Sequence, residues 1–184
     1  MKVTHAVEIS PSAADTLKRN SPSTVVCNQC SNIVLKYAVK SHAGQRDEVP
    51  THIKSQEELP PPPAQGQIDC IVAGFPCQSY STLNTYQQAH DWKSHLMLTL
   101  LSWVDFLRPK YCFFENVKGF LQYNLHASQA SKYIVEGGND KGGLEFLLLS
   151  MALSGAVLTV RGRYQVRFSL LQAGHYGTPQ WRIR

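Results

Sequence analysis

The sequence predicts an α/β fold built around a doubly wound, mainly parallel sheet. Short apolar runs that suit buried strands alternate with longer segments of helical spacing along the chain. Several apolar runs end close to a reactive side chain, at the place where ligands bind to such sheets. The chain has 184 residues, of which 43% are hydrophobic, and this size suits one domain with a buried core.

The first half of the chain contains two strand–helix units. T-H-A-V-E-I predicts a short strand that ends near Glu8. Residues 11–20 predict a helix, because Ser10 suits the N-cap position and Pro11 suits the first turn. The β-branched run S-T-V-V-C predicts the second strand, and residues 31–40 carry apolar side chains at helical spacing.

The second half repeats this order. Residues 68–74 form an apolar run that predicts a strand, and residues 94–107 predict a strongly apolar helix that Pro109 stops. Residues 111–115 predict the next strand. The order is completed by a helix and a final strand, expected in residues 144–153 and 164–172.

Two segments interrupt the alternation of strands and helices. Residues 42–67 are charged and then proline-rich, which predicts a linker without regular structure for most of its length. Residues 122–143 are polar and contain two glycine pairs, so most of them are expected to form an insertion loop.

Composition limits the class of protein and its surroundings. The formal net charge is +5 and the pI is near 9.0, which fits a polyanionic partner such as nucleic acid but is common among soluble proteins. The five cysteines are an odd number and no secretory leader pattern is seen, so free thiols in a reducing compartment are expected. No apolar run approaches the roughly 20 residues of a membrane span, and no membrane association is expected.

A thiol and two carboxylates stand at the ends of predicted strands. Glu8 ends the first strand, Cys77 follows the third, and Glu115 closes the fourth. Because Cys77 and Glu115 come from consecutive strand units, neighbouring parallel strands would place them side by side. A thiolate that adds to C6 of cytosine makes C5 nucleophilic toward a methyl group, and a carboxylic acid can donate to ring N3. The pair therefore suits methylation of a cytosine.

The cysteines also allow other interpretations. A cysteine hydrolase would need a histidine within hydrogen-bond reach of Cys77, and none of the seven histidines lies in a recognisable motif. A free cysteine is commonly a small buried residue, which is the interpretation adopted for Cys70 and Cys112. Cys27 and Cys30 form a C-x-x-C pair without a second pair at ligand spacing, so no metal is expected there.

Three short motifs occur in a fixed order: P-C-Q at residues 76–78, E-N-V at 115–117 and Q-W-R-I-R at 180–184. Together with A-G-F-P-C-Q-S-Y-S and L-L-Q-A-G-H-Y-G-T-P-Q, they resemble the DNA (cytosine-5) methyltransferases. The resemblance is closer to the eukaryotic maintenance-type enzymes than to the small bacterial ones. The resemblance implies a Rossmann-like sheet of the S-adenosylmethionine-dependent methyltransferases, with helices on both faces. Residues 1–184 would be part of the catalytic domain, incomplete at both ends.

The resemblance also implies roles for individual residues. Cys77 would be the nucleophile and Glu115 the group that faces cytosine N3, while Arg182 and Arg184 would steady the flipped base and a nearby phosphate. Contacts to S-adenosylmethionine would come from Glu8 at the ribose hydroxyls and from Gln29, Cys30, Phe75 and Pro76. Contacts to DNA would come from Gln78, Ser79, Ser81 and Gln180.

The implied reaction is methyl transfer from S-adenosylmethionine to C5 of a flipped cytosine in double-stranded DNA, through a covalent cysteine–C6 adduct. The implied location is the nucleus, with room for chromatin partners in a full-length relative. Three features of the family pattern are missing from this sequence. They are the Gly-rich F-x-G-x-G turn, the acidic residue expected near Gln29 or Cys30, and the target-recognition region. These departures support a second hypothesis, a catalytically incompetent remnant or incomplete gene product that acts at most as a weak DNA-binding or interaction module.

Overall fold

The structure is a computed structural model that describes most of the first half of the chain and parts of the second. The described residues are 2–45, 48–74, 96–116, 128–131, 134–136, 164, 167, 169–181 and 183. The chain divides into two compact units, one made of Met1–Asp69 and Ser102–Lys110 and the other of Cys70–Leu101 and Tyr111–Arg184. Among the described residues, none of the helices combines the length and apolarity that a membrane crossing needs.

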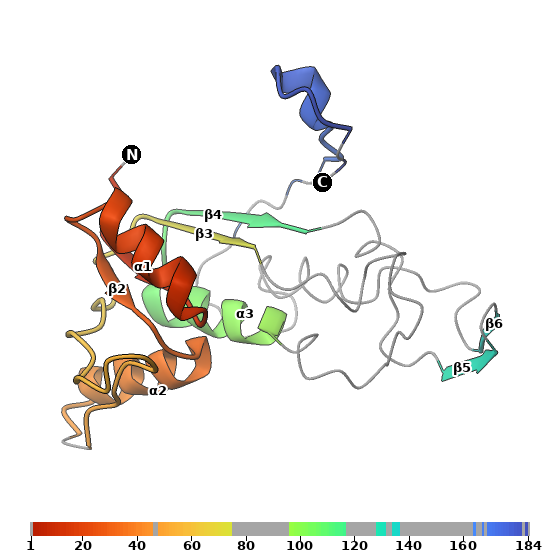
Figure 1. Cartoon of the computed structure of the whole chain (residues 1–184). Coiled ribbons are helices and arrows are strands. Elements are labelled where there is room, and N and C mark those ends of the chain that lie inside the picture. Colours follow the sequence, from red (N-terminus) through yellow and green to blue (C-terminus); the bar gives the residue numbers. More distant parts are fainter. Residues whose placement is uncertain are drawn as a thin grey trace. The chain divides into compact units, whose positions relative to one another are not determined.

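The first unit is built on a strand–helix–strand–helix succession (Figure 1). Strand β1 (His5–Val7) pairs in parallel with β2 (Val25–Cys27), and helix α1 (Pro11–Asn20) connects them. Helix α2 (Ser31–His42) follows β2. All four elements were predicted from the sequence, with boundaries that agree to within a few residues.

The start of α1 differs in one detail from the prediction. Ser10 occupies the N-cap position and Pro11 the first turn, but the Ser10 side chain makes no capping hydrogen bond. Its hydroxyl lies 3.1 Å from the Ser12 hydroxyl, and its backbone amide donates to Glu8 Oε1 at 2.8 Å. The carboxylate therefore engages the backbone where the chain enters α1.

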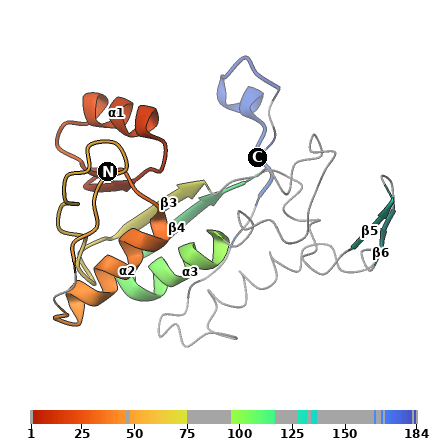
Figure 2. The same ribbon diagram turned by 60° about the horizontal axis from the view of Figure 1, so that its bottom comes forward.

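The second half of α3 (Leu96–Leu107) contributes to the core of the first unit. Trp103, Val104 and Leu107 are buried, and the Trp103 indole donates to the Ser31 hydroxyl at 2.8 Å. Phe106 lies edge-on to His42, with ring centroids 5.7 Å apart. Figure 2 shows α2 and α3 side by side, as these contacts require. Because Trp103 and Ser31 are 72 positions apart in sequence, this packing joins the end of α3 to the unit of the opening strands.

Residues 48–69 have no helix or strand, which confirms the prediction of irregular structure for this part of the linker, yet they are closely organised. Thr51 forms an isolated antiparallel bridge with Glu58, and Leu59 is buried. The backbone amide of Ile53 donates to the Asn28 carbonyl at 2.9 Å. We call residues 50–59 the docked loop, because these bonds hold it against the end of β2.

The second unit contains a parallel pair and an antiparallel pair of strands. Strands β3 (Cys70–Gly74) and β4 (Tyr111–Glu115) run parallel with Cys70 opposite Tyr111 and Gly74 opposite Glu115. Strands β5 (Ser128–Ser131) and β6 (Ile134–Glu136) form a short hairpin within the segment predicted to be mostly an insertion loop. The side chains of Cys70 and Cys112 are half-buried rather than fully buried as predicted.

The predicted strand at residues 164–172 is wrong for the residues that the structure describes there. Residues 169–171 have no regular structure, and Gln172 makes only an isolated bridge with Ile183. A short 3₁₀ helix, η3 (Ala173–Tyr176), follows. The helix predicted at residues 144–153 lies outside the described residues.

The structure confirms the mixed α/β class and the parallel pairing of successive strands. Within the described part of the chain, however, the strands form three separate two-stranded sheets. The union of the two parallel pairs into one doubly wound sheet remains a prediction.

Candidate functional site

Glu8 lies just beyond β1, at the edge where parallel strands bring ligand-binding residues together. Its backbone amide donates to the Cys27 carbonyl at 3.1 Å, which extends the pairing of β1 with β2. Its Oε1 accepts the hydrogen bond from the Ser10 amide, while Oε2 has no hydrogen-bond partner among the described residues. The carboxylate is therefore held by the backbone through one of its two oxygens.

Asn28 joins the ends of β1 and β2 and was not among the predicted site residues. Its side-chain Nδ2 donates to the carbonyls of Glu8 and Ile9, at 2.9 and 3.1 Å. The residue is 3% exposed, and its Oδ1 is buried without a partner among the described residues. An asparagine directly after a strand end was the only sequence signal that could have indicated this role.

Gln29 and Cys30 were predicted to contact S-adenosylmethionine, and their hydrogen bonds are made within the protein. Gln29 Nε2 donates to the Thr51 carbonyl at 2.7 Å, and Gln29 Oε1 accepts from the Cys30 amide at 2.8 Å. Cys30 is half-buried at the N-cap position of α2. Both ends of the Gln29 amide are therefore engaged within the protein, one of them by the docked loop.

His52 is the buried centre of the docked loop. It is 7% exposed, and its Nδ1 accepts a hydrogen bond from the Asn28 amide at 3.1 Å. Burial lowers the pKa of His52, and the positive charge of Lys18 lowers it further, while Glu57 acts in the opposite direction. A histidine that accepts at Nδ1 must be unprotonated on that atom, so the geometry and the pKa direction agree.

Cys27 and Cys30 are both free thiols, as are Cys70 and Cys112. Burial raises the pKa of Cys27, which favours the protonated thiol over the thiolate that metals bind. Within the described ranges, no three His, Cys, Asp or Glu side chains gather closely enough to hold a metal ion.

Glu115 closes β4 and lies against Gly74 at the end of β3. A Cβ atom added to Gly74 would lie 3.1 Å from Glu115 Oε2. The Glu115 carboxylate therefore occupies space that a side chain at position 74 would need. Cys77 is three residues beyond Gly74, and three residues of extended chain span at most about 11 Å. The predicted adjacency of the two strands is thus confirmed, whereas Cys77 itself lies outside the described residues.

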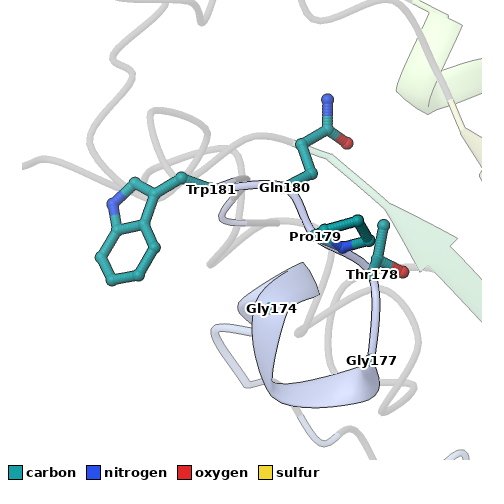
Figure 3. A pocket seen from close by; sticks show the side chains of 6 residues that line it. All are labelled: Gly174, Gly177, Thr178, Pro179, Gln180 and Trp181. Atoms are coloured by element: carbon teal, nitrogen blue, oxygen red, sulfur yellow. The ribbon is translucent and has the colours of Figure 1, made fainter.

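The C-terminal loop, residues 172–183, is closed by the bridge between Gln172 and Ile183. It turns through η3 and Gly177, whose φ of 79° suits glycine. A hollow of about 430 Å³ is lined by Gly174, Gly177, Thr178, Pro179, Gln180 and Trp181 (Figure 3). Gln180, predicted to contact DNA, is exposed, and its backbone amide donates to the Thr178 carbonyl at 2.6 Å.

The other predicted site residues lie outside the described residues. They are Phe75, Pro76, Cys77, Gln78, Ser79, Ser81, Arg182 and Arg184. The structure therefore brings together Glu8 with Asn28, and Glu115 with Gly74, and describes Gln180 within the C-terminal loop.

Comparison with known proteins gives a consistent result. Residues 1–136 match the family model for the C-5 cytosine-specific DNA methylases. The chain is 31% identical over 97% of its length to DNA (cytosine-5)-methyltransferase 4 of Arabidopsis thaliana, of which it covers 11%. It is 28% identical to DNA (cytosine-5)-methyltransferase 1 of Mus musculus and 27% identical to DNA (cytosine-5)-methyltransferase PliMCI of Paracentrotus lividus. Both of these matches span 97% of this chain and 9% of the relative, so the chain corresponds to a small part of each.

Proposed function

Since this chain belongs to the C-5 cytosine-specific DNA methylases, we propose that it is part of an enzyme that methylates C5 of cytosine in double-stranded DNA. The observation that carries the proposal is the parallel register of β3 and β4, which sets Glu115 beside Gly74, three residues before Cys77. A thiol and a carboxyl from adjacent strand ends are the two groups that addition to a pyrimidine ring requires.

In the proposed reaction the Cys77 thiolate forms a bond to C6 of an extruded cytosine. Glu115, as the carboxylic acid, donates a hydrogen bond or proton to N3 and so stabilises the charge that the addition places on the ring. C5 then takes the methyl group, loses its proton to a base, and the Cys77–C6 bond breaks to restore the aromatic ring. The chain's own contribution is thus one nucleophile and one acid held on neighbouring strands.

S-adenosylmethionine would supply the electrophilic methyl group when bound. The residues that follow β1 and β2 fit it in chemical type, because Glu8 Oε2 is an acceptor suited to ribose hydroxyls and Asn28 Oδ1 is a buried acceptor without a partner among the described residues. Gln29, Cys30, Phe75 and Pro76 would complete the site. This assignment also requires the two parallel strand pairs to belong to one Rossmann-like sheet.

DNA contacts are proposed for Gln78, Ser79, Ser81 and Gln180, with Arg182 and Arg184 at the flipped base and a nearby phosphate. We also propose a nuclear location, which the eukaryotic relatives support, and chromatin partners for the full-length protein. The chain spans about a tenth of the relatives' length. The proposed activity is therefore that of a longer protein that contains this chain.

A covalent trap tests the catalytic assignment. DNA that carries 5-fluorocytosine cannot lose the substituent at C5, so the enzyme remains bonded to C6. We expect a cross-linked species from a longer protein that contains this sequence, its loss in Cys77→Ser, and its strong reduction in Glu115→Gln. Adduct formation by Cys77→Ser at the wild-type level would refute the role of the thiol.

One observation favours the second candidate, a catalytically incompetent remnant with at most weak DNA binding. Both ends of the Gln29 amide are already hydrogen-bonded within the chain, at the position where the family pattern has an acidic residue. Calorimetric titration of the 184-residue chain with S-adenosylmethionine separates the candidates. Micromolar binding supports the enzyme, and no heat up to millimolar cofactor supports the remnant.

A further inference from the structure

The docked loop is braced by its own backbone. The Leu59 amide donates to the Pro50 carbonyl at 2.8 Å. The His52 amide donates to the Glu57 carbonyl, also at 2.8 Å. Gln56 lies in the turn between these bonds with a φ of 57°, and its amide donates to the His52 carbonyl at 3.1 Å. These bonds lie within the loop, so its shape does not depend only on its contacts with β2.

Asn28 is the residue through which the docked loop contacts the end of β2. Its backbone amide donates to His52 Nδ1 at 3.1 Å, and its carbonyl accepts from the Ile53 amide at 2.9 Å. The Asn28 side chain in turn donates to the carbonyls of Glu8 and Ile9, at 2.9 and 3.1 Å. Both backbone groups of Asn28 are therefore bonded to the loop, while its side chain holds the backbone that carries the Glu8 carboxylate.

A second connection runs from the docked loop to Gln29. Gln29 Nε2 donates to the Thr51 carbonyl at 2.7 Å, and Gln29 Oε1 accepts from the Cys30 amide at 2.8 Å. A side-chain amide has two N–H donors and two acceptor lone pairs, so these bonds orient it and leave it capable of further ones. The loop thus orients Gln29 directly and Glu8 through Asn28. Gln29 and Glu8 are both proposed contacts of S-adenosylmethionine.

Burial of His52 favours the neutral imidazole that this arrangement needs. His52 is 7% exposed, and burial is the largest cause of its lowered pKa. Lys18 of α1 lowers the pKa further, whereas Glu57 within the loop raises it. Lys54 pairs with Asp15 of α1, but both side chains are partly exposed, so this ion pair contributes little to docking. The contact between the loop and β2 therefore depends on the protonation of the His52 imidazole.

We propose that the docked loop is a positioning element of the S-adenosylmethionine site and that protonation of His52 releases it. The neutral imidazole holds the Asn28 backbone, and the Thr51 carbonyl holds the Gln29 side chain. His52 and Thr51 act through these neighbours and need not touch the cofactor. The inference rests on the proposed function, because it concerns the cofactor of the proposed methyl transfer. Affinity for the cofactor is then complete while His52 is neutral and falls as the pH drops through its folded-state pKa.

Calorimetric titration of the 184-residue chain with S-adenosylmethionine tests the proposal. The pH should range from about 5 to 7, where the α-amino group of the cofactor keeps its charge. The wild-type Kd should rise as the pH falls, by up to about tenfold for each unit below the folded-state pKa of His52. His52→Asn, whose amide oxygen can accept from Asn28 without titrating, should bind like the wild type near neutral pH and depend less on pH. His52→Ala should bind roughly 2- to 12-fold more weakly near neutral pH, the range expected for one hydrogen bond.

His5→Asn is the matched control for the pH dependence. The pKa of His5 is also lowered by burial, but this residue lies in β1 and its Nδ1 is 3.1 Å from the Thr4 hydroxyl. His5→Asn should therefore keep the dependence of cofactor affinity on pH that the wild type shows.

A second measurement needs no cofactor. In nuclear magnetic resonance spectra, the backbone amide signal of Asn28 should shift with the titration of His52 in the wild-type chain. The same signal should not follow pH in this way in His52→Asn. The spectra also show that each variant is folded at each pH, so a loss of affinity is separated from a loss of fold.

The outcomes separate this inference from the proposed function. Equal affinity and equal pH dependence in the wild type, His52→Asn and His52→Ala overturn the inference alone. An Asn28 signal that does not follow His52 also overturns it. Wild-type chain that binds no cofactor near neutral pH overturns both the inference and the cofactor assignment for this chain.

Discussion

The backbone amide of Asn28 donates a hydrogen bond to Nδ1 of His52, with 3.1 Å between the two nitrogens. This bond joins the end of β2 to the docked loop across 24 positions of sequence. It requires the neutral form of the imidazole, and the lowered pKa of His52 shows that the folded state favours that form. Protonation of His52 at Nδ1 would therefore remove this bond.

The first prediction concerns the effect of this protonation on stability. Because the folded-state pKa of His52 lies below its unfolded value near 6.5, the unfolded chain binds more protons as the pH falls. The stabilisation is therefore complete above about pH 6.5 and is lost as the pH falls through that value toward the folded-state pKa. The free energy of unfolding, measured in urea between about pH 5 and 8, should rise with pH across this window.

His52→Asn is the matched variant for this prediction, because its amide oxygen can accept from Asn28 without titrating. Its stability should depend less on pH than that of the wild type. The pKa of His5 is also lowered by burial, so a smaller slope of the same sign should remain. Equal slopes for the wild type and His52→Asn would show that the buried imidazole does not control the docking.

The second prediction concerns the side chain of Asn28. Replacement by alanine removes the donor that serves the Glu8 and Ile9 carbonyls and should lower the free energy of unfolding by about 1–3 kcal/mol. Asn20→Ala, at the exposed end of α1, is the matched control and should change stability by less than about 0.5 kcal/mol. Similar losses for the two variants in chemical denaturation would contradict the structural role of Asn28.

The third prediction uses the close approach of Gly74 to Glu115. A methyl group in Gly74→Ala would come within 3.1 Å of Glu115 Oε2, and the carboxylate can move away because it is the end of a flexible side chain. Stability should change little, but a shift of the acid should reduce the rate of adduct formation with 5-fluorocytosine DNA roughly 10- to 100-fold. Adduct formation at the wild-type rate would show that Glu115 does not act from this position.

The fourth prediction concerns the unpaired amide in the C-terminal loop. Gln172→Leu keeps the approximate volume and removes two buried polar atoms that have no partners among the described residues, so it should raise the free energy of unfolding by about 1–3 kcal/mol. Gln180→Leu, whose amide is exposed, should leave stability unchanged in the same urea titration. A loss of stability in Gln172→Leu would mean that the amide is satisfied within the fold.

The alternation of strands and helices was predictable from the sequence because each element carries a local signal. Helix α1 begins at a serine and a proline, and β4 is a short aromatic run bounded by a proline before it and a carboxylate at its end. The adjacency of β3 and β4 followed from their being consecutive strand units. The position of Glu115 next to the end of β3 could therefore be derived from the order of the residues alone.

The docked loop could not be derived in the same way. Its residues are polar and rich in turns, and its organisation depends on bonds to Asn28 and Gln29 that no periodicity indicates. The predicted final strand is also wrong for the described residues, since Leu170 and Leu171 are both exposed in irregular backbone. Long-range contacts organise the docked loop, and local propensity carries no information about them.

The pairing of β3 with β4 also limits how the gene can vary. Side chains alternate between the two faces of a strand, so sliding β4 by one position against β3 would turn Glu115 to the opposite face. A single-codon insertion or deletion within β4 would have this effect, whereas the connection that precedes it can absorb such a change in backbone outside the ladder. Length variation among natural or designed versions should therefore accumulate before Tyr111 and stay out of residues 111–115.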